Sequence, residues 1–196
     1  MIIFPAVSYT HLALRADCTM PIARVVATKL SGQPVPYRLC YSQKVFSASK
    51  QLHEATQCGV ELIGENGVRA DVEILNLAVK SQKEVFNGDF QIEIGHGKLF
   101  QILIEAFGID DETAEKARQL IEMKNFAAIQ AMNLPYEIKI LPRMFGDSSV
   151  LDEYSAIVSR PEVDAVLNYL KELYSFLSEN GYGDCVHFDL GLVNRL

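Results

Sequence analysis

Gln57 and Glu61 form the pair of polar residues whose chemistry and spacing best suit ligand binding. Both lie in residues 56–63, where the alternation of side-chain types is typical of a β-strand. Residues four apart on a strand share a face, about 13 Å apart along it, and Gly59 between them has no side chain. Such a notch between an amide and a carboxylate could hold a small polar molecule with an amine or an imidazole. The same pattern also fits an ordinary solvated strand face with a bulge at Gly59.

A second polar pair, Asp17 and Thr19, stands directly before a segment with apolar residues at helical spacing. A carboxylate and a hydroxyl at this position could receive an ammonium group. The alternative is structural: Thr19 would cap the helix, with Pro21 in its first turn and Asp17 at the surface. The residues alone leave both interpretations open.

Other polar residues are weaker candidates. His96 lies between two glycines and could be a ligand or base, although such a residue is also common in a turn. Asp189 ends a predicted strand and could be functional or could start a turn. Asp71 and Glu73 are two apart near a helix start, so they do not face each other and better fit the helix dipole. No Ser-His-Asp order, Cys-His nucleophile or H-E-x-x-H motif is present.

Composition narrows the class of protein. The 196 residues are 49% hydrophobic and 22% charged, enough for a folded core. The formal net charge is −7 with scattered basic residues, which argues against nucleic acid as a partner. Four cysteines without C-x-x-C or zinc spacing predict free thiols in a reducing cytoplasm. No apolar run is long enough to span a membrane. The short apolar stretch at residues 1–7 does not fit a signal peptide. We expect the protein to bind neither a metal nor a cofactor.

The elements that position these residues follow from hydrophobic periodicity and turn signals. Helices are predicted at residues 19–30, 70–86, 98–107, 110–124, 126–132 and 161–179, and strands at 37–46, 56–63, 90–95 and 185–190. Residues 47–53 are polar and predict a hairpin loop, and residues 87–89 predict a break after a helix. There is no βαβ regularity and no glycine-rich phosphate loop. The pattern predicts an antiparallel-rich α+β sheet with helices packed on it.

The domain organisation follows from the same pattern. We expect a core whose first part is residues 12–109 and whose second part is residues 156–196. Residues 110–155 would form a small helical insertion between them, and residues 1–11 remain unassigned.

Five motifs in this order resemble one known family. They are L-A-L-R-A-D-C-T-M-P-I-A-R-V at residues 12–25, Y-S-Q-K-V-F at 41–46, Q-C-G-V-E-L-I-G at 57–64, A-D-V-E-I-L at 70–75 and F-D-L-G-L-V at 188–193. Together they resemble the histidyl-tRNA synthetases and their paralogues, the regulatory subunits of ATP phosphoribosyltransferase. The resemblance runs from Leu12 to Leu196. It implies a class II aminoacyl-tRNA synthetase-like antiparallel sheet flanked by helices, truncated here at both ends.

The resemblance also implies roles for individual residues. Asp17, Thr19, Gln57 and Glu61 fall where the synthetases contact histidine. Two arginines that handle phosphate in the synthetases are replaced, one by Ser47 and one at Asn194. A hydroxyl cannot provide the bidentate contact of an arginine, and the loss of one such donor costs on the order of 3 kcal/mol of transition-state stabilisation. The resemblance therefore implies histidine binding without catalytic residues.

Residues 90–96, F-Q-I-E-I-G-H, favour the paralogue, because they resemble its segment that ends in I-G-H. The synthetases have an N-S-x-G pattern where this chain has Gly95-His96-Gly97. The expected function is that of a non-catalytic regulatory subunit of ATP phosphoribosyltransferase, required for the first step of histidine biosynthesis and its feedback regulation. The implied partners are the catalytic subunit, in a hetero-oligomer, and histidine as an effector, with self-association of the full-length protein. The alternatives are a histidine–tRNA ligase catalytic core fragment and a degenerate synthetase-like domain that serves only as a scaffold.

Overall fold

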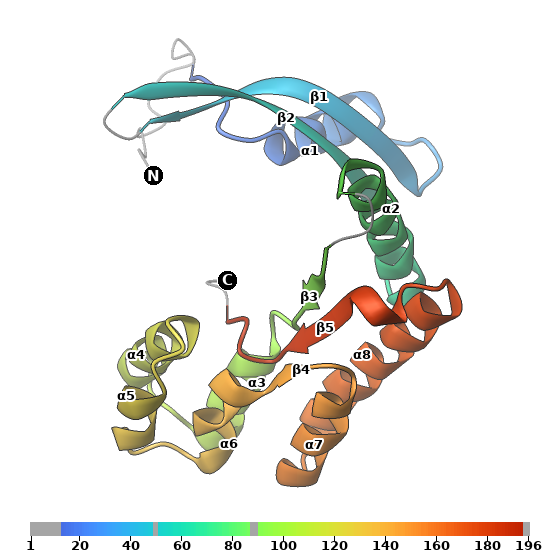
Figure 1. Ribbon diagram of the computed structural model, residues 1–196. Helices are drawn as coiled ribbons and strands as arrows, with labels where there is room; N and C mark the ends of the chain where they lie inside the picture. The colour runs from blue at the N-terminus through green and yellow to red at the C-terminus, as the bar shows by residue number, and fades with distance from the viewer. Residues whose placement is uncertain (1–12, 49–50, 87–89, 194–196) are drawn as a thin grey trace. The chain divides into compact units, whose positions relative to one another are not determined.

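The computed structural model describes residues 13–48, 51–86 and 90–193, and the chain divides into two compact units, Met1–Asn66 and Gly67–Leu196 (Figure 1). Within the described residues the chain mixes helices with a two-stranded and a three-stranded sheet, in agreement with the predicted α+β class.

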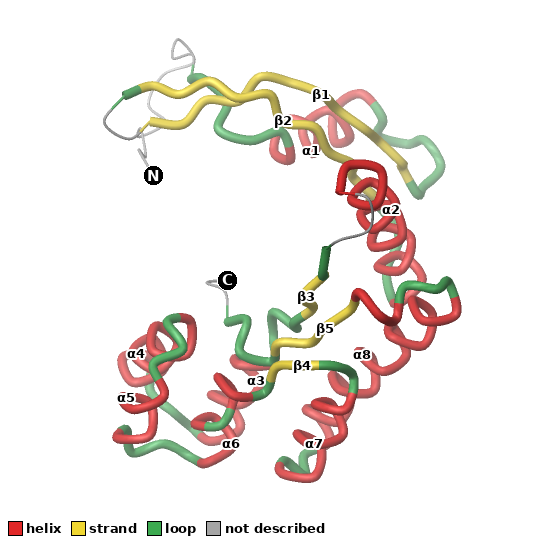
Figure 2. The backbone as a smooth tube through the Cα atoms, in the orientation of Figure 1, coloured by secondary structure: helices red, strands yellow, loops and turns green. Residues whose placement is uncertain are grey.

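The first unit is one helix on a long β-hairpin (Figure 2). Its elements are α1 (Thr19–Lys29), β1 (Tyr37–Ala48) and β2 (Leu52–Ile63). The strands pair antiparallel in continuous register from Tyr37 opposite Ile63 to Ala48 opposite Leu52. The predicted loop at residues 47–53 was therefore too long, since the backbone ladder continues through polar side chains, and Gly59 is not at a bulge.

Hydrogen bonds fix the ends of the α1 segment to β1. The hydroxyl of Tyr37 lies within hydrogen-bonding distance of two carbonyl oxygens just after α1, those of Leu30 at 2.7 Å and Gln33 at 2.9 Å. Before the helix, the N–H of Phe46 donates to the carbonyl of Arg15 at 2.8 Å. The residues after α1 are thus held at the first residue of β1, and the residues before it are held near the last residues of β1.

The second unit contains the remaining elements. The helices are α2 (Val68–Phe86), α3 (Leu99–Phe107), α4 (Asp111–Glu122), α5 (Phe126–Ala131), α6 (Tyr136–Lys139), α7 (Ser149–Ile157) and α8 (Pro161–Glu179), with 3-10 turns at Leu141–Arg143 and Gly183–Cys185. The strands are β3 (Ile92–Ile94), β4 (Phe145–Gly146) and β5 (Val186–Asp189). In the sheet, β5 lies between β3, to which it is parallel, and β4, to which it is antiparallel.

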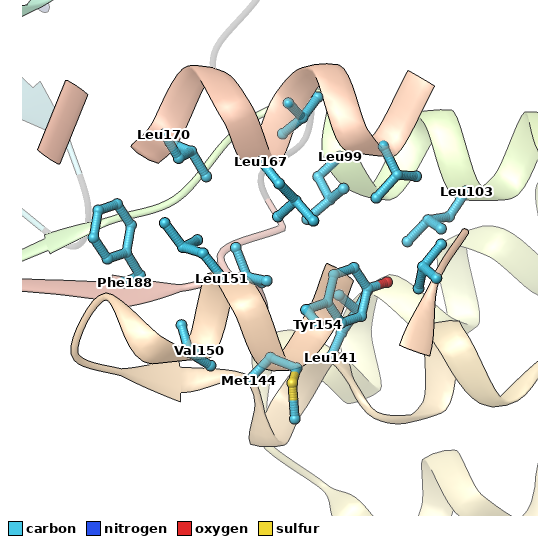
Figure 3. Close-up of a cluster of buried hydrophobic side chains, with 14 of the residues drawn as sticks. Leu99, Leu103, Leu141, Met144, Val150, Leu151, Tyr154, Leu167, Leu170 and Phe188 are labelled. Carbon is cyan, nitrogen blue, oxygen red and sulfur yellow. The ribbon is translucent and has the colours of Figure 1, made fainter. Parts of the chain in front are cut away.

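One face of this sheet forms part of the hydrophobic core. Its buried side chains are those of Ile94, Val186 and Phe188, which alternate with more polar residues along their strands. Figure 3 shows Phe188 close to Leu170 of α8, with leucines of α3, α7 and α8 and the ring of Tyr154 filling the layer beyond it. The opposite face carries Glu93 and His187, which are paired across β3 and β5.

Most predicted elements of this unit are confirmed, within a residue or two at their ends. The last long helix has the predicted bounds, and Asp110 caps α4 by accepting the N–H of Thr113 at 2.9 Å. The strand predicted at 90–95 is shorter than expected, and the sequence did not predict α6, α7 or β4. The break predicted at residues 87–89 lies outside the described residues.

The sequence predicted free cysteines and no membrane span. All four cysteines are free thiols, as predicted. No helix among residues 13–48, 51–86 and 90–193 is both long and apolar enough to cross a membrane. The helices α4 to α6 fall within residues 110–155, α7 begins in this range and ends at Ile157, and the boundaries of the predicted insertion remain a prediction.

Candidate functional site

One face of the β-hairpin brings the first predicted pair together with residues of β1. Gln57 and Glu61 lie on β2 with Gly59 between them, and the register places Gln43 opposite Gln57 and Tyr41 opposite Gly59. Since alternate residues of a strand share a face, these five residues line the same side of the hairpin.

The second predicted pair meets this face directly. The hydroxyl of Thr19 donates to Oε1 of Glu61 at 2.9 Å. The prediction that Thr19 caps α1 was wrong, because Cys18 occupies the N-cap position and no side chain caps from there. The carboxylate of Asp17 instead accepts the N–H of Met20, at 3.3 Å, within the first turn. Asp17, Thr19 and Glu61 therefore gather at the start of α1.

The space at Gly59, which the sequence predicted to be an open notch, is occupied by Tyr41. A Cβ atom added at Gly59 would lie 2.4 Å from the Tyr41 hydroxyl oxygen and 2.5 Å from the adjoining ring carbon, closer than real contacts allow. The ring of Tyr41 therefore covers the glycine, and the space predicted as a notch is filled by an aromatic side chain. Gly59 is needed because only a residue without a side chain lets this ring lie flat on β2.

The electrostatic environment at Tyr41 is negative. Burial raises the pKa of the Tyr41 hydroxyl above its usual value, and the charge of Glu61 raises it further, followed by smaller effects of Cys18 and Asp17. Burial disfavours any charge at this hydroxyl, but the nearby negative charges of Glu61 and Asp17 favour a cation beside it. The start of α1 and the middle of β2 thus suit a positively charged ligand group.

Positive charge lies a short way along the hairpin. The guanidinium of Arg15 donates through Nη1 to Oε1 of Gln43 at 3.2 Å, and Gln43 is the cross-strand partner of Gln57. The Oε1 atom of Gln57 is buried and has no hydrogen-bond partner among the described residues. The hairpin face thus has carboxylates at one end, and an amide oxygen without a partner and a guanidinium at the other end. This arrangement of charges would complement a zwitterionic amino acid.

Ser47 is an exposed residue of β1, opposite His53 and near the tip of the hairpin. Its short hydroxyl side chain offers no cation to a phosphate. Asn194, the other position at which the resemblance implies a lost arginine, lies outside the described residues.

The weaker candidates lie in the second unit. Asp71 accepts a hydrogen bond from the Tyr169 hydroxyl at 2.6 Å, and burial together with this bond raises the pKa of Tyr169 to about 12. The ring of His96 meets that of Tyr169 edge-on at 6.3 Å, beside a cavity of about 440 Å³. Burial and the charge of Lys98 lower the pKa of His96.

A helix on a long β-hairpin, followed by a unit that mixes helices with a small sheet, is the arrangement of a class II synthetase-like domain. The chain belongs to the histidyl-tRNA synthetase family, whose sequence model matches residues 3–196. The ATP phosphoribosyltransferase regulatory subunit of Clostridium kluyveri is 35% identical over 202 residues, which cover 94% of this chain and 51% of that protein. The chain thus spans about half the length of this relative.

Solved structures agree with the family assignment. An ATP phosphoribosyltransferase regulatory subunit/histidyl-tRNA synthetase from Bacillus halodurans C superposes with a TM-score of 0.82 at 29% identity, over 91% of this chain and 50% of the other. A chain of the ATP phosphoribosyl transferase (HisG:HisZ) complex from Thermotoga maritima gives a TM-score of 0.72 at 25% identity, over 92% and 65%. The predicted class II synthetase-like fold is thereby confirmed.

Proposed function

We propose that this chain is part of a non-catalytic regulatory subunit of ATP phosphoribosyltransferase, and that it binds histidine on the hairpin face beneath α1. In this role it supports the first step of histidine biosynthesis and its feedback regulation. The names of the relative from Clostridium kluyveri and of the complex from Thermotoga maritima support the proposal. The protein works in the cytoplasm, as a hetero-oligomer with the catalytic subunit, and the full-length protein self-associates.

The contact between Thr19 and Glu61 carries the proposal. This 2.9 Å hydrogen bond joins the two segments predicted to bind histidine, which are 42 residues apart in the sequence. Beside it, Asp17 and Glu61 create the negative field at Tyr41. The α-ammonium of histidine fits this end, where Asp17, Thr19 and Glu61 offer oxygen acceptors. The imidazole then lies towards the buried, unpaired Oε1 of Gln57, to which a ring N–H can donate.

Ser47 supports the non-catalytic part of the proposal. An aminoacyl-adenylate forms through a transition state with charge on the phosphate oxygens, and a guanidinium stabilises such charge by paired hydrogen bonds. The exposed hydroxyl of Ser47 supplies neither the charge nor the second donor. A site that keeps its amino-acid contacts while lacking this cation binds its ligand without activating it.

Calorimetric titration of histidine into the purified chain tests the binding site. We expect saturable binding that Glu61→Gln weakens at least tenfold, because hydrogen bonds to charged groups contribute about 1.5–3 kcal/mol. Glu65→Gln is the matched control: it removes the same charge from an exposed residue just beyond β2 and should leave the affinity unchanged. Equal affinities of the wild type and the Glu61 variant would refute the assignment of this face.

Two activity measurements distinguish the alternatives. Mixed with the catalytic subunit, the full-length protein should raise the phosphoribosyltransferase rate, and histidine should lower it; the Gln57→Ala variant should lose the response to histidine but keep the stimulation. Histidine-dependent pyrophosphate exchange should be absent. A clear exchange signal would instead support a histidine–tRNA ligase core, and an unchanged response in the Gln57 variant would support a scaffold.

A further inference from the structure

The polar face of the three-stranded sheet borders a second cavity, of about 580 Å³. It is lined by Gln91 and Glu93 beside and on β3, by Phe145 and Gly146 of β4, by His187, Phe188 and Asp189 of β5, and by Lys124 and Phe126 at the turn between α4 and α5. All of these residues belong to the second unit, and none is a residue proposed above to bind histidine.

The charges of this cavity are fixed by one buried ion pair. Nζ of Lys124 lies 2.8 Å from Oδ1 and 2.6 Å from Oδ2 of Asp189, and the N–H of Gly191 donates to the same Oδ1 at 2.8 Å. Asp189 is only 6% exposed and is the one buried charged residue among the described residues. Lys124 has a positive φ of 50°, a conformation that costs a non-glycine residue energy and here delivers its ammonium to the carboxylate. The positive charge of Lys124 is thus already neutralised.

A second lining carboxylate remains available to a ligand. Glu93 is exposed, and its side-chain carboxylate makes no hydrogen bond or ion pair within residues 13–48, 51–86 and 90–193. It lies opposite His187, whose Nδ1 atom is buried without a partner among those residues. Asp147, next to the lining residue Gly146, interacts electrostatically with His187. An anionic ligand would meet repulsion here, while a cation would gain an uncompensated carboxylate.

Two aromatic rings complete the lining. The ring of Phe145 is 59% exposed and has the ammonium of Lys124 5.5 Å from its centre, and Phe126 has the guanidinium of Arg143 at the same distance. Both rings therefore already lie in the geometry that attracts cations to an aromatic face. They also offer apolar area to a flat hydrocarbon or heteroaromatic group.

We infer that this cavity is a binding site for a small organic cation that combines an ammonium group with a flat ring. The ammonium pairs with Glu93, and the ring packs against Phe126 and Phe145. The ion pair between Lys124 and Asp189 sets the shape of the cavity and keeps the lysine from recruiting an anion instead.

Titration with 2-phenylethylamine, followed by two-dimensional NMR of the labelled chain, tests this inference. The matched anion is 3-phenylpropionate and the neutral analogue is 2-phenylethanol. We expect the amine to shift the amide signals of Gly146 and His187 and to bind at least tenfold more tightly than the anion. Glu93→Gln should weaken the binding of the amine about tenfold and Phe145→Ala about threefold, as expected for the loss of a charged hydrogen bond and of an aromatic ring contact.

The variants used here are at surface positions, so folding can be verified independently by circular dichroism. Glu153→Gln, an exposed change of the same charge on α7, should leave the affinity as in the wild type. The inference is overturned if the amine gives no saturable shifts, if the anion binds as tightly, if Glu93→Gln has no effect, or if the shifted signals belong only to Gly59, Glu61 and their neighbours.

Discussion

Removal of the ammonium at Lys124 should destabilise the second unit measurably. In Lys124→Met the Asp189 carboxylate, whose side chain is 8% exposed, keeps the N–H of Gly191 and loses both contacts to Nζ. Breaking a buried pair typically costs 3–5 kcal/mol. Because the Lys124 side chain is 36% exposed, solvent screens part of the interaction, and we expect a loss of about 2 kcal/mol. For a unit of this size that corresponds to a fall in Tm of roughly 6–8 °C.

Thermal and urea unfolding, followed by circular dichroism, measure this effect. Asp189→Asn should cost only about 1 kcal/mol, since the amide oxygen still accepts from Gly191 and Lys124 can turn to water. The double variant should then be less destabilised than the sum of the single variants, which is the signature of direct coupling. Lys80→Met, at an exposed position of α2, controls for loss of a lysine charge. If Lys124→Met unfolds within about 0.3 kcal/mol of the wild type, or if the changes are additive, the pair does not have the described importance.

Three further perturbations test other features. Gly59→Ala should displace the Tyr41 ring, because the added Cβ would lie 2.4 Å from the Tyr41 hydroxyl oxygen. We expect histidine binding, measured by calorimetry, to weaken about tenfold. An unchanged affinity would mean that the ring is not part of the site. The pKa of His96 is lowered from 6.5, so the neutral form stabilises the fold: stability is fully present above pH 6.5 and is lost as the pH falls through the lower folded pKa. Urea unfolding between pH 7.5 and 5 should show this loss, and His96→Gln should reduce its slope. Tyr154→Phe leaves the Glu137 carbonyl without its 3.0 Å donor in the core and should cost about 1–2 kcal/mol in the same unfolding assay, whereas a neutral result would mean that water replaces the donor.

The elements that the sequence predicted well are those with strong local signals. The helix α8 begins with a proline at its first position and ends at Asn180-Gly181, and its buried leucines recur at helical spacing. The short elements α6 and β4 have too few residues for a period to be visible. They form because Ile138, Leu141 and Met144 pack into a core built from distant segments, which no local pattern reveals.

Some features of the candidate site also follow from local sequence patterns, and others depend on contacts between distant segments. The shared face of Gln57 and Glu61 follows from the two-residue period of a strand, and the structure confirms it. Tyr41 could not be placed, because its position over Gly59 depends on the register between two strands. For Thr19, local statistics left a helix cap and a binding role both open, because its partner Glu61 lies 42 residues away. Knowledge of the hairpin register would have been enough to identify Tyr41.

The order of strands in the second unit has a consequence for how it folds. The central strand of the sheet, β5, is the last of its strands in the sequence, and Ile92 pairs with Val186 some 94 residues later. Until β5 has been synthesised, β3 and β4 have no partner among the described strands of this sheet, so the sheet cannot form before the last strand is available. Folding of this unit is therefore dominated by a late, long-range closure step, in which a four-residue strand joins its two neighbours and completes the core around Phe188.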